Sequence, residues 1–139
     1  MGRTTTTRKI IMKTRKTPLR YPGGKSRVAK DFIPRFPRDI GEYREPFLGG
    51  GSVALLFSQI YPDVPVWVND KYIYLYNFWV HLQKEGDRLS EELVKIKEDH
   101  STEDKAKELF KDAKDKIHKE DPYTQAVLFW VLNKCSYSG

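Results

Sequence analysis

The sequence predicts an α/β fold, and two observations carry that prediction. Short apolar stretches at residues 43–47 and 64–69 have the length and composition of β-strands, and stretches with helical spacing, residues 52–60 and 72–83, follow them. A strand–helix–strand–helix order is typical of a parallel sheet with covering helices. Three consecutive glycines at residues 49–51 separate the first strand from its helix, where such folds bind ligands.

The glycine segment matches a nucleotide-binding pattern. Read as Gly49-x-Gly51-x-x-Ala54, it has the spacing of the dinucleotide fingerprint, with alanine in the last place. The helix that begins near Ser52 directs its free N–H groups and positive dipole end towards the same loop. The fingerprint expects an acidic residue about twenty positions later, and Asp70 follows the second strand there. These features predict a nucleotide-like or carboxylate-bearing ligand, and by spacing alone they allow NAD.

A second distinctive stretch, RYPGGKS at residues 20–26, precedes the first strand. Its Gly-Lys-Ser ending resembles the end of a P-loop, but that motif needs a glycine where Leu19 lies and a strand before it. We therefore reject a P-loop and interpret the stretch as a tight loop that presents Arg20, Tyr21 and Lys25. Helical spacing follows over residues 27–36.

Composition restricts the class of protein. A chain of 139 residues with 39% hydrophobic residues fits one folded domain. The single cysteine, Cys135, excludes an internal disulfide and a cysteine-based zinc site, and the three histidines lie on predicted helices without partners at ligand spacing. No apolar run reaches the roughly 18 residues of a membrane span, and no signal peptide is visible. We therefore expect a soluble cytoplasmic protein with no metal site and no membrane span.

Positive charge is concentrated at the N-terminus. Residues 1–20 hold seven of the 25 basic residues and no acidic one, so the other 18 basic residues face 19 acidic ones. Such arms commonly contact phosphates, which favours a nucleic-acid partner, although a disordered solubilising tail has the same composition. We expect residues 1–16 to form a basic, disordered arm.

The C-terminal part is predicted to be helical. Residues 87–100 and 102–119 are highly charged, with apolar residues on one face, as in solvent-exposed helices. Asp121 followed by Pro122 is typical of a helix start, and the apolar residues 123–132 then predict a buried helix.

Four segments of this chain resemble Dam-type DNA adenine-N6 methyltransferases and occur in the order seen in that family. They are RYPGGKS (20–26), EPFLGGGSV (45–53), Asn69-Asp70 and AVLFWVLN (126–133). The closing residues Tyr137-Ser-Gly139 also resemble the aromatic–polar–glycine segment after that family's apolar helix. The resemblance covers residues 17–139, and the first two segments together are specific.

The resemblance implies S-adenosylmethionine (AdoMet) as the ligand in place of NAD. By this likeness Tyr21 packs on the adenosine and Lys25 lies near the cofactor and the target base. The loop that contains Phe47, Gly49, Gly51 and Ser52 holds the methionine end, and Asp70 accepts hydrogen bonds from the ribose hydroxyls. Asp70 has a simpler alternative role as a cap for the helix that begins near Tyr72.

The same likeness implies double-stranded DNA as substrate, with Arg20 and Tyr137 at DNA-contacting positions. The implied fold is a Rossmann-like half-domain, with an AdoMet-binding part over residues 17–85 and an inserted helical DNA-recognition segment over residues 86–139. The implied source is a bacterium, an archaeon or a phage.

The family's catalytic motif is missing from this chain. That motif, Asp-Pro-Pro-Tyr or a close variant, holds an adenine that is flipped out of the duplex. The chain has only Asp121-Pro122-Tyr123, which lacks one proline and begins a helix. We therefore expect no catalytic residue here, and a second polypeptide that completes a split enzyme. The alternatives are a non-catalytic AdoMet- or DNA-binding module and an NAD-type Rossmann protein.

Overall fold

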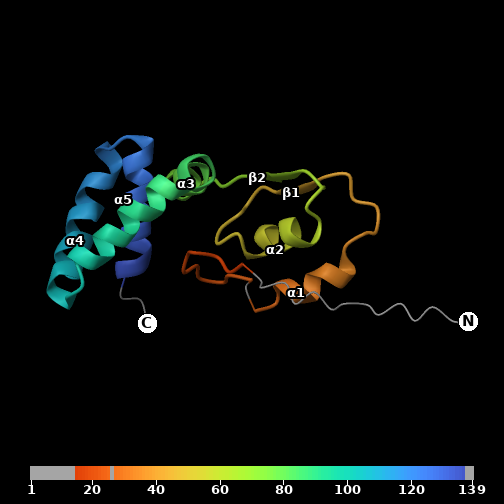
Figure 1. The fold of residues 1–139 in the computed structure, drawn as a ribbon, viewed down its shortest axis with the longest axis horizontal. Helices are drawn as coiled ribbons and strands as arrows, with labels where there is room; N and C mark the ends of the chain where they lie inside the picture. Colours follow the sequence, from red (N-terminus) through yellow and green to blue (C-terminus); the bar gives the residue numbers. More distant parts are fainter. Residues whose placement is uncertain (1–14, 26, 137–139) are drawn as a thin grey trace, which may run out of the picture.

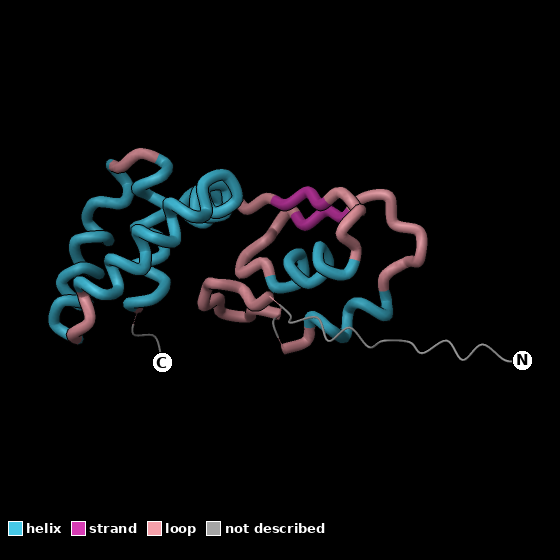
Figure 2. The backbone as a smooth tube through the Cα atoms, viewed as in Figure 1, coloured by secondary structure: helices cyan, strands magenta, loops and turns pink. Residues whose placement is uncertain are grey.

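The computed structural model describes residues 15–25 and 27–136. Figure 1 shows two parts that lie side by side, a small two-stranded sheet with short helices and a bundle of longer helices. Figure 2 shows that a helix leads directly from the end of the sheet into the bundle. No helix of the described part is long and apolar enough to cross a membrane.

The sheet has the predicted parallel pairing. Strand β1 (Tyr43–Glu45) pairs with β2 (Val66–Val68), with Tyr43 opposite Val66 and Glu45 opposite Val68. The connecting helix α2 (Ser52–Ile60) has the bounds that its spacing predicted, whereas both strands are shorter than predicted. This arrangement confirms the α/β class.

Aromatic side chains hold α2 against one face of the sheet. Phe57 is fully buried, and its ring stacks on that of Tyr43 with centroids 4.4 Å apart. Phe36 packs edge-on against Phe57 at 5.4 Å, just after the short helices α1 (Ala29–Phe32) and η1 (Ile33–Arg35). Edge-to-face and offset pairs of this kind add to the free energy gained from burial alone.

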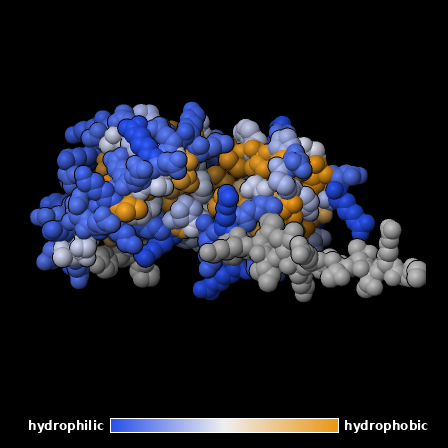
Figure 3. Space-filling view, in the orientation of Figure 1, coloured by the Kyte–Doolittle hydropathy of each residue, from blue (hydrophilic) through white to orange (hydrophobic). Residues whose placement is uncertain are grey.

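The opposite face of the sheet is open, and the predicted cover is absent. The strand–helix–strand–helix order predicted that the helix over 72–83 covers the sheet, but Tyr72 and Tyr76 in that stretch are 49% and 40% exposed. Trp67 of β2 is 48% exposed. Figure 3 shows apolar residues at the surface of the α/β part, whereas the bundle is mostly hydrophilic in this view. The reason is that α3 buries its apolar face in the bundle.

The bundle consists of α3 (Ile73–Asp99), α4 (Glu103–Lys116), the single turn η2 (Ile117–Lys119) and α5 (Pro122–Cys135). Side chains of α3, η2 and α5, together with one loop residue, form its core. The buried members are Leu19, Leu75, Phe78, Leu89, Leu93, Ile117, Ala126, Val127 and Phe129. Leu19 comes from the loop before the sheet, so this loop is anchored in the helical part.

Helix α3 is kinked where the sequence predicted a break. The sequence predicted separate helices over 72–83 and 87–100, and two helical stretches meet at Glu85, whose backbone angles (φ −144°, ψ 45°) are not helical. The Glu85 carboxylate accepts from Arg88 at 2.7 Å and lies 3.3 Å from His81 Nδ1. Side-chain pairs three and four residues apart support the helix on both sides of this kink.

The predicted start of α5 is confirmed. Asp121 Oδ1 accepts hydrogen bonds from the backbone N–H groups of Tyr123 and Thr124, at 3.0 and 3.2 Å. Pro122 occupies the first turn, where its missing N–H costs nothing. Thr102 caps α4 in the same way by accepting from Lys105 N.

Candidate functional site

A cavity of about 230 Å³ lies where the glycine segment meets the loop of residues 21–25. The two motifs that form it are separated in sequence by α1 and η1, and they meet in space at this cavity. Six of the seven residues predicted to bind the cofactor line it: Tyr21, Lys25, Phe47, Gly49, Gly51 and Ser52.

Two of the glycines are required by their backbone conformation and by the rings beside them. Gly49 and Gly51 have φ angles of +53° and +67°, which residues with a side chain rarely adopt. A Cβ on Gly49 would lie 2.9 Å from Tyr21 Cε1, and a Cβ on Gly51 would lie 2.9 Å from Trp79 Cζ2. Trp79 Nε1 also donates to the Gly49 carbonyl at 3.0 Å. Two aromatic rings, those of Tyr21 and Trp79, therefore pack against the loop.

Ser52 presents an unsatisfied hydroxyl at the start of α2. Its Oγ is buried and has no hydrogen-bond partner among the described residues. Buried polar atoms are nearly always paired, so an unpaired hydroxyl that lines a cavity is suited to a ligand. The N-terminal N–H groups of α2, which begins at Ser52, add a positive partial charge there.

Asp70 supports the loop from outside the cavity. Its Oδ2 accepts from Gly49 N at 2.8 Å, and its Oδ1 accepts from Tyr72 N at 3.0 Å. The carboxylate therefore joins the glycine segment to the start of α3, in line with the capping alternative. Asp70 lines a neighbouring cavity of about 450 Å³, together with Trp79 and residues of β2.

Tyr21 and Lys25 form the other wall. Tyr21 is 43% exposed, and its ring lies against Gly49. Lys25 Nζ donates to the Gly23 carbonyl at 2.9 Å, which holds the ammonium group near the loop backbone. Phe47, which is 80% exposed, stands at the rim of the cavity.

Glu45 is a lining residue that the sequence analysis missed. It ends β1, and its Oε2 accepts from the Tyr43 hydroxyl at 2.8 Å. Burial raises the pKa of Glu45, although hydrogen bonds from Tyr43 and the Ala54 N–H oppose that shift. Burial and the adjacent carboxylate also raise the pKa of Tyr43. The available signal was an acidic residue directly before the predicted loop, in the Glu45-Pro46-Phe47 stretch.

The two residues predicted to contact DNA lie outside this cavity. Arg20 has its backbone bonded to Asn133 of α5, and its side chain lines a different cavity. Tyr137 lies outside the described residues. Within residues 15–25 and 27–136, no cluster of three or more His, Cys, Asp or Glu side chains has the geometry to hold a metal ion.

Comparison with known proteins decides the family. Residues 21–139 match the family model described as D12 class N6 adenine-specific DNA methyltransferase. The chain belongs to this family. The match covers both motifs that form the cavity, and it confirms the resemblance found in the sequence.

A relative within known methyltransferases is the Type II methyltransferase M.MjaIII of Methanocaldococcus jannaschii. It is 29% identical over 132 residues, which cover 87% of this chain and 46% of the relative. The chain therefore spans about half the length of this relative.

Proposed function

We propose that this chain is the AdoMet-binding half of a DNA adenine-N6 methyltransferase with a Rossmann-like fold. The main evidence for this proposal is the cavity. It is formed where the loop of residues 21–25 meets the glycine segment. The unpaired Ser52 hydroxyl and the N-terminus of α2 lie beside it. Family membership supports adenine in DNA as the methyl acceptor.

The lining residues fit the chemistry of AdoMet. Its methionine end carries one ammonium and one carboxylate group, and the cavity offers one group of each opposite charge, Glu45 and Lys25. The Ser52 hydroxyl and the first N–H groups of α2 suit the carboxylate. Tyr21, whose exposed ring lies against Gly49, suits the adenosine. The cavity is open at the exposed Phe47, so a ligand can extend beyond it.

Within this arrangement the chain positions the reaction and forms no covalent bond. Bound AdoMet supplies an electrophilic methyl group on its sulfonium sulfur. The glycine segment fixes the depth of the site, and Asp70 fixes the glycine segment through Gly49 N. We also assign to Asp70 a role towards the ribose, because each oxygen retains a lone pair after the bonds to Gly49 and Tyr72. Orientation of this kind supplies much of the rate in a direct transfer.

The groups that hold the target adenine are proposed to come from outside this chain, on a second polypeptide. The tripeptide Asp121-Pro122-Tyr123 has a structural role in place of a catalytic one. Asp121 caps α5, and the Tyr123 hydroxyl donates to Glu92 at 2.7 Å. The open face of the sheet, with Trp67 half exposed, offers apolar surface for the complementing part.

DNA recognition is assigned to the helical segment of residues 86–139, with Arg20, Tyr137 and the basic arm of residues 1–16. Residues 17–85 form the AdoMet-binding part. These assignments rest on the family resemblance and on the charge distribution of the sequence.

The deciding experiment is calorimetric titration of the purified chain with AdoMet, with NAD as the comparison ligand. We expect AdoMet to bind and NAD to give no heat of binding. Binding of NAD alone would favour the NAD-type Rossmann protein. Binding of neither would leave DNA binding as the function of the chain.

A second experiment tests the split enzyme. Native mass spectrometry of the tagged chain from its own host should find a stoichiometric polypeptide with an Asp-Pro-Pro-Tyr-like motif. Transfer of labelled methyl groups from AdoMet to DNA should then need both polypeptides. An enzyme-like rate from the purified chain alone would contradict the split, and AdoMet binding without any such partner would favour a non-catalytic module.

A further inference from the structure

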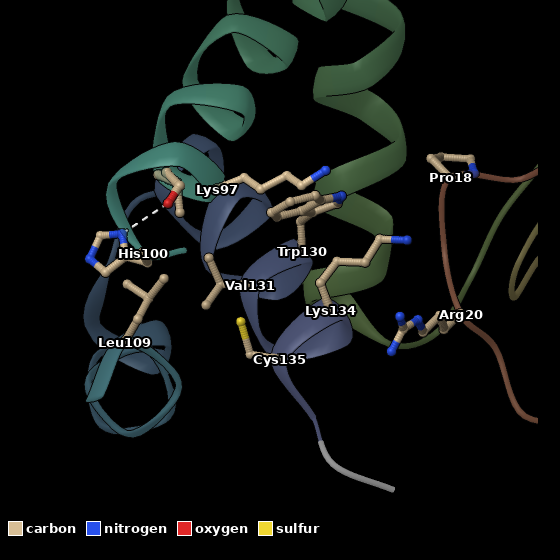
Figure 4. A pocket seen from close by; sticks show the side chains of 10 residues that line it. Pro18, Arg20, Lys97, His100, Leu109, Trp130, Val131, Lys134 and Cys135 are labelled. Atoms are coloured by element: carbon tan, nitrogen blue, oxygen red, sulfur yellow. Dashed lines mark hydrogen bonds between the residues drawn. The ribbon is translucent and has the colours of Figure 1, made fainter. Parts of the chain in front are cut away.

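A second and larger cavity, of about 570 Å³, lies in the bundle where the ends of α3 and α5 face the loop before the sheet (Figure 4). Its volume is in the range of cavities that hold small ligands. The lining residues are Pro18, Arg20, Ile96, Lys97, His100, Leu109, Trp130, Val131, Lys134 and Cys135. We call it the cationic cavity, because three of these residues are Arg or Lys and none is acidic.

The three cations come from three different segments. Arg20 belongs to the N-terminal loop, Lys97 to the last turn of α3 and Lys134 to the last turn of α5. Within the described residues, none of their charged groups takes part in a hydrogen bond or an ion pair. Two lysines of α4 do have acidic partners, Lys107 with Glu103 and Lys116 with Asp112, both at 2.7 Å.

Two of these cations, Arg20 and Lys134, repel each other. Burial lowers the pKa of Lys134, and the positive charge of Arg20 lowers it further. Like charges that are held near each other, with no acidic residue in the lining, are stabilised when an anion binds between them.

The position of Arg20 is fixed before any ligand binds. Its backbone N–H donates to Asn133 Oδ1 at 2.9 Å, and Asn133 Nδ2 donates to its carbonyl. Figure 4 shows the side chains of Lys97, Trp130 and Lys134 extending to the same side, towards the segment that carries Pro18 and Arg20. The indole adds a flat apolar surface next to the cations, as aromatic side chains do in sites for single-stranded nucleic acid.

We propose that the cationic cavity binds a backbone phosphate of DNA between Arg20, Lys97 and Lys134, with the adjoining nucleotide against Trp130. The inference rests on the proposed function, which supplies DNA as the substrate. Phosphate contacts set the position of a protein on the duplex without reading its sequence. The site therefore holds the helical segment at a fixed place relative to the cofactor loop, which begins at the next residue, Tyr21.

The test uses the salt dependence of DNA binding by the full chain. Each phosphate contact that is lost reduces the slope of log K against log salt by about 0.9. We expect Lys97→Gln and Lys134→Gln to bind duplex DNA more weakly and each to lower the slope by up to about that amount. Lys30→Gln, at an exposed position of α1 outside both the cavity and residues 86–139, is the control and should retain the wild-type slope. Circular dichroism checks that all three variants are folded, since Gln and Lys have similar helix propensity.

The outcomes separate this inference from the proposed function. Unchanged slopes and affinities in Lys97→Gln and Lys134→Gln, with wild-type DNA binding intact, would overturn the cavity as a DNA site and leave the proposed function standing. Failure of the wild-type chain to bind DNA would overturn both the DNA part of that function and this inference. Inorganic pyrophosphate, titrated at constant ionic strength, is the second probe. Pyrophosphate binding that Lys134→Gln abolishes while DNA binding is unchanged would show a free-anion site and overturn the inference.

Discussion

The side-chain amide of Asn133 hydrogen-bonds both backbone groups of Arg20, although 113 residues separate the two in sequence. Arg20 N donates to Asn133 Oδ1 at 2.9 Å, and Asn133 Nδ2 donates to Arg20 O at 2.5 Å. Next to this pair, Leu19 is buried in the core of the bundle. The loop that carries Tyr21 is thus held by the helical part, so changes in α5 should reach the proposed cofactor site.

Asn133→Ala tests this connection. The substitution removes two hydrogen bonds at a partly exposed site, so we expect the free energy of unfolding to fall by about 1 kcal/mol. AdoMet affinity should fall as well, because Tyr21 is no longer fixed. Urea unfolding and calorimetric titration measure the two effects. Gln83→Ala is the control, since Gln83 is an exposed amide of α3 and should change stability by less than about 0.5 kcal/mol. An equally small effect of Asn133→Ala would mean that the loop is held by Leu19 alone.

Gly49→Ala should damage the proposed site directly. Its φ of +53° costs a non-glycine residue about 1–2 kcal/mol, and the new Cβ would lie 2.9 Å from Tyr21 Cε1. We expect lower stability and loss of AdoMet binding, measured by thermal shift with and without the ligand.

Gly41→Ala is the matched control for that substitution. No atom lies within 4 Å of a Cβ at Gly41, and its φ is not in the left-handed region. We expect Gly41→Ala to leave stability unchanged or slightly raised, because alanine restricts the unfolded chain. If both variants kept wild-type AdoMet affinity, the glycine loop would not be the cofactor site.

Asp70→Ala separates support of the loop from contact with the cofactor. The carboxylate accepts from Gly49 N and Tyr72 N, so its removal should lower the free energy of unfolding by about 2 kcal/mol while the chain still folds. AdoMet affinity should fall sharply in a calorimetric titration. Asp63→Ala, at an exposed acid in the connection between α2 and β2, should change neither quantity. Unchanged affinity in Asp70→Ala would remove Asp70 from the site.

Local sequence patterns were enough to predict the elements that interactions between neighbouring residues determine. The glycine-to-serine transition predicted the bounds of α2, and the Asp121-Pro122 pair predicted the start of α5. Residues of both predicted cofactor-binding segments, 20–26 and 45–53, line one cavity, as the family resemblance implied. The ligand roles of these residues stay predictions.

Contacts between distant segments could not be predicted in this way. Nothing local indicates that Leu19 belongs to the bundle core, or that Arg20 and Lys134 face the same cavity, because periodicity says which face is apolar and not what covers it. The same limit explains the error over Tyr72 and Tyr76. The order of strands and helices suggested a cover for the sheet, but the apolar face of α3 packs against α5, and these two rings stay exposed. The break predicted between residues 83 and 87 corresponds to the kink of α3 at Glu85.

The cap of α5 makes the free energy of unfolding fall as the pH is lowered. The hydrogen bond from the Thr124 hydroxyl, followed by that from its backbone N–H, lowers the pKa of Asp121 below its ordinary value of 3.8. The unfolded chain therefore takes up a proton at this carboxyl before the folded chain does. The stabilisation is complete above the ordinary pKa and is lost as the pH falls through the lowered one.

Asp121→Asn isolates this contribution, because asparagine caps helices about as well as aspartate but does not titrate. We expect the wild-type chain to be the more stable one near neutral pH, where the charged carboxylate also interacts with the helix dipole. The difference in free energy of unfolding should narrow as the pH falls from about 6 to about 2.5, because only the wild type loses a charged cap. Urea unfolding of both chains at a series of pH values measures it, and the other acidic groups cancel in the comparison. A difference that stays constant with pH would mean that the carboxylate charge does not stabilise α5 and that hydrogen bonding alone forms the cap.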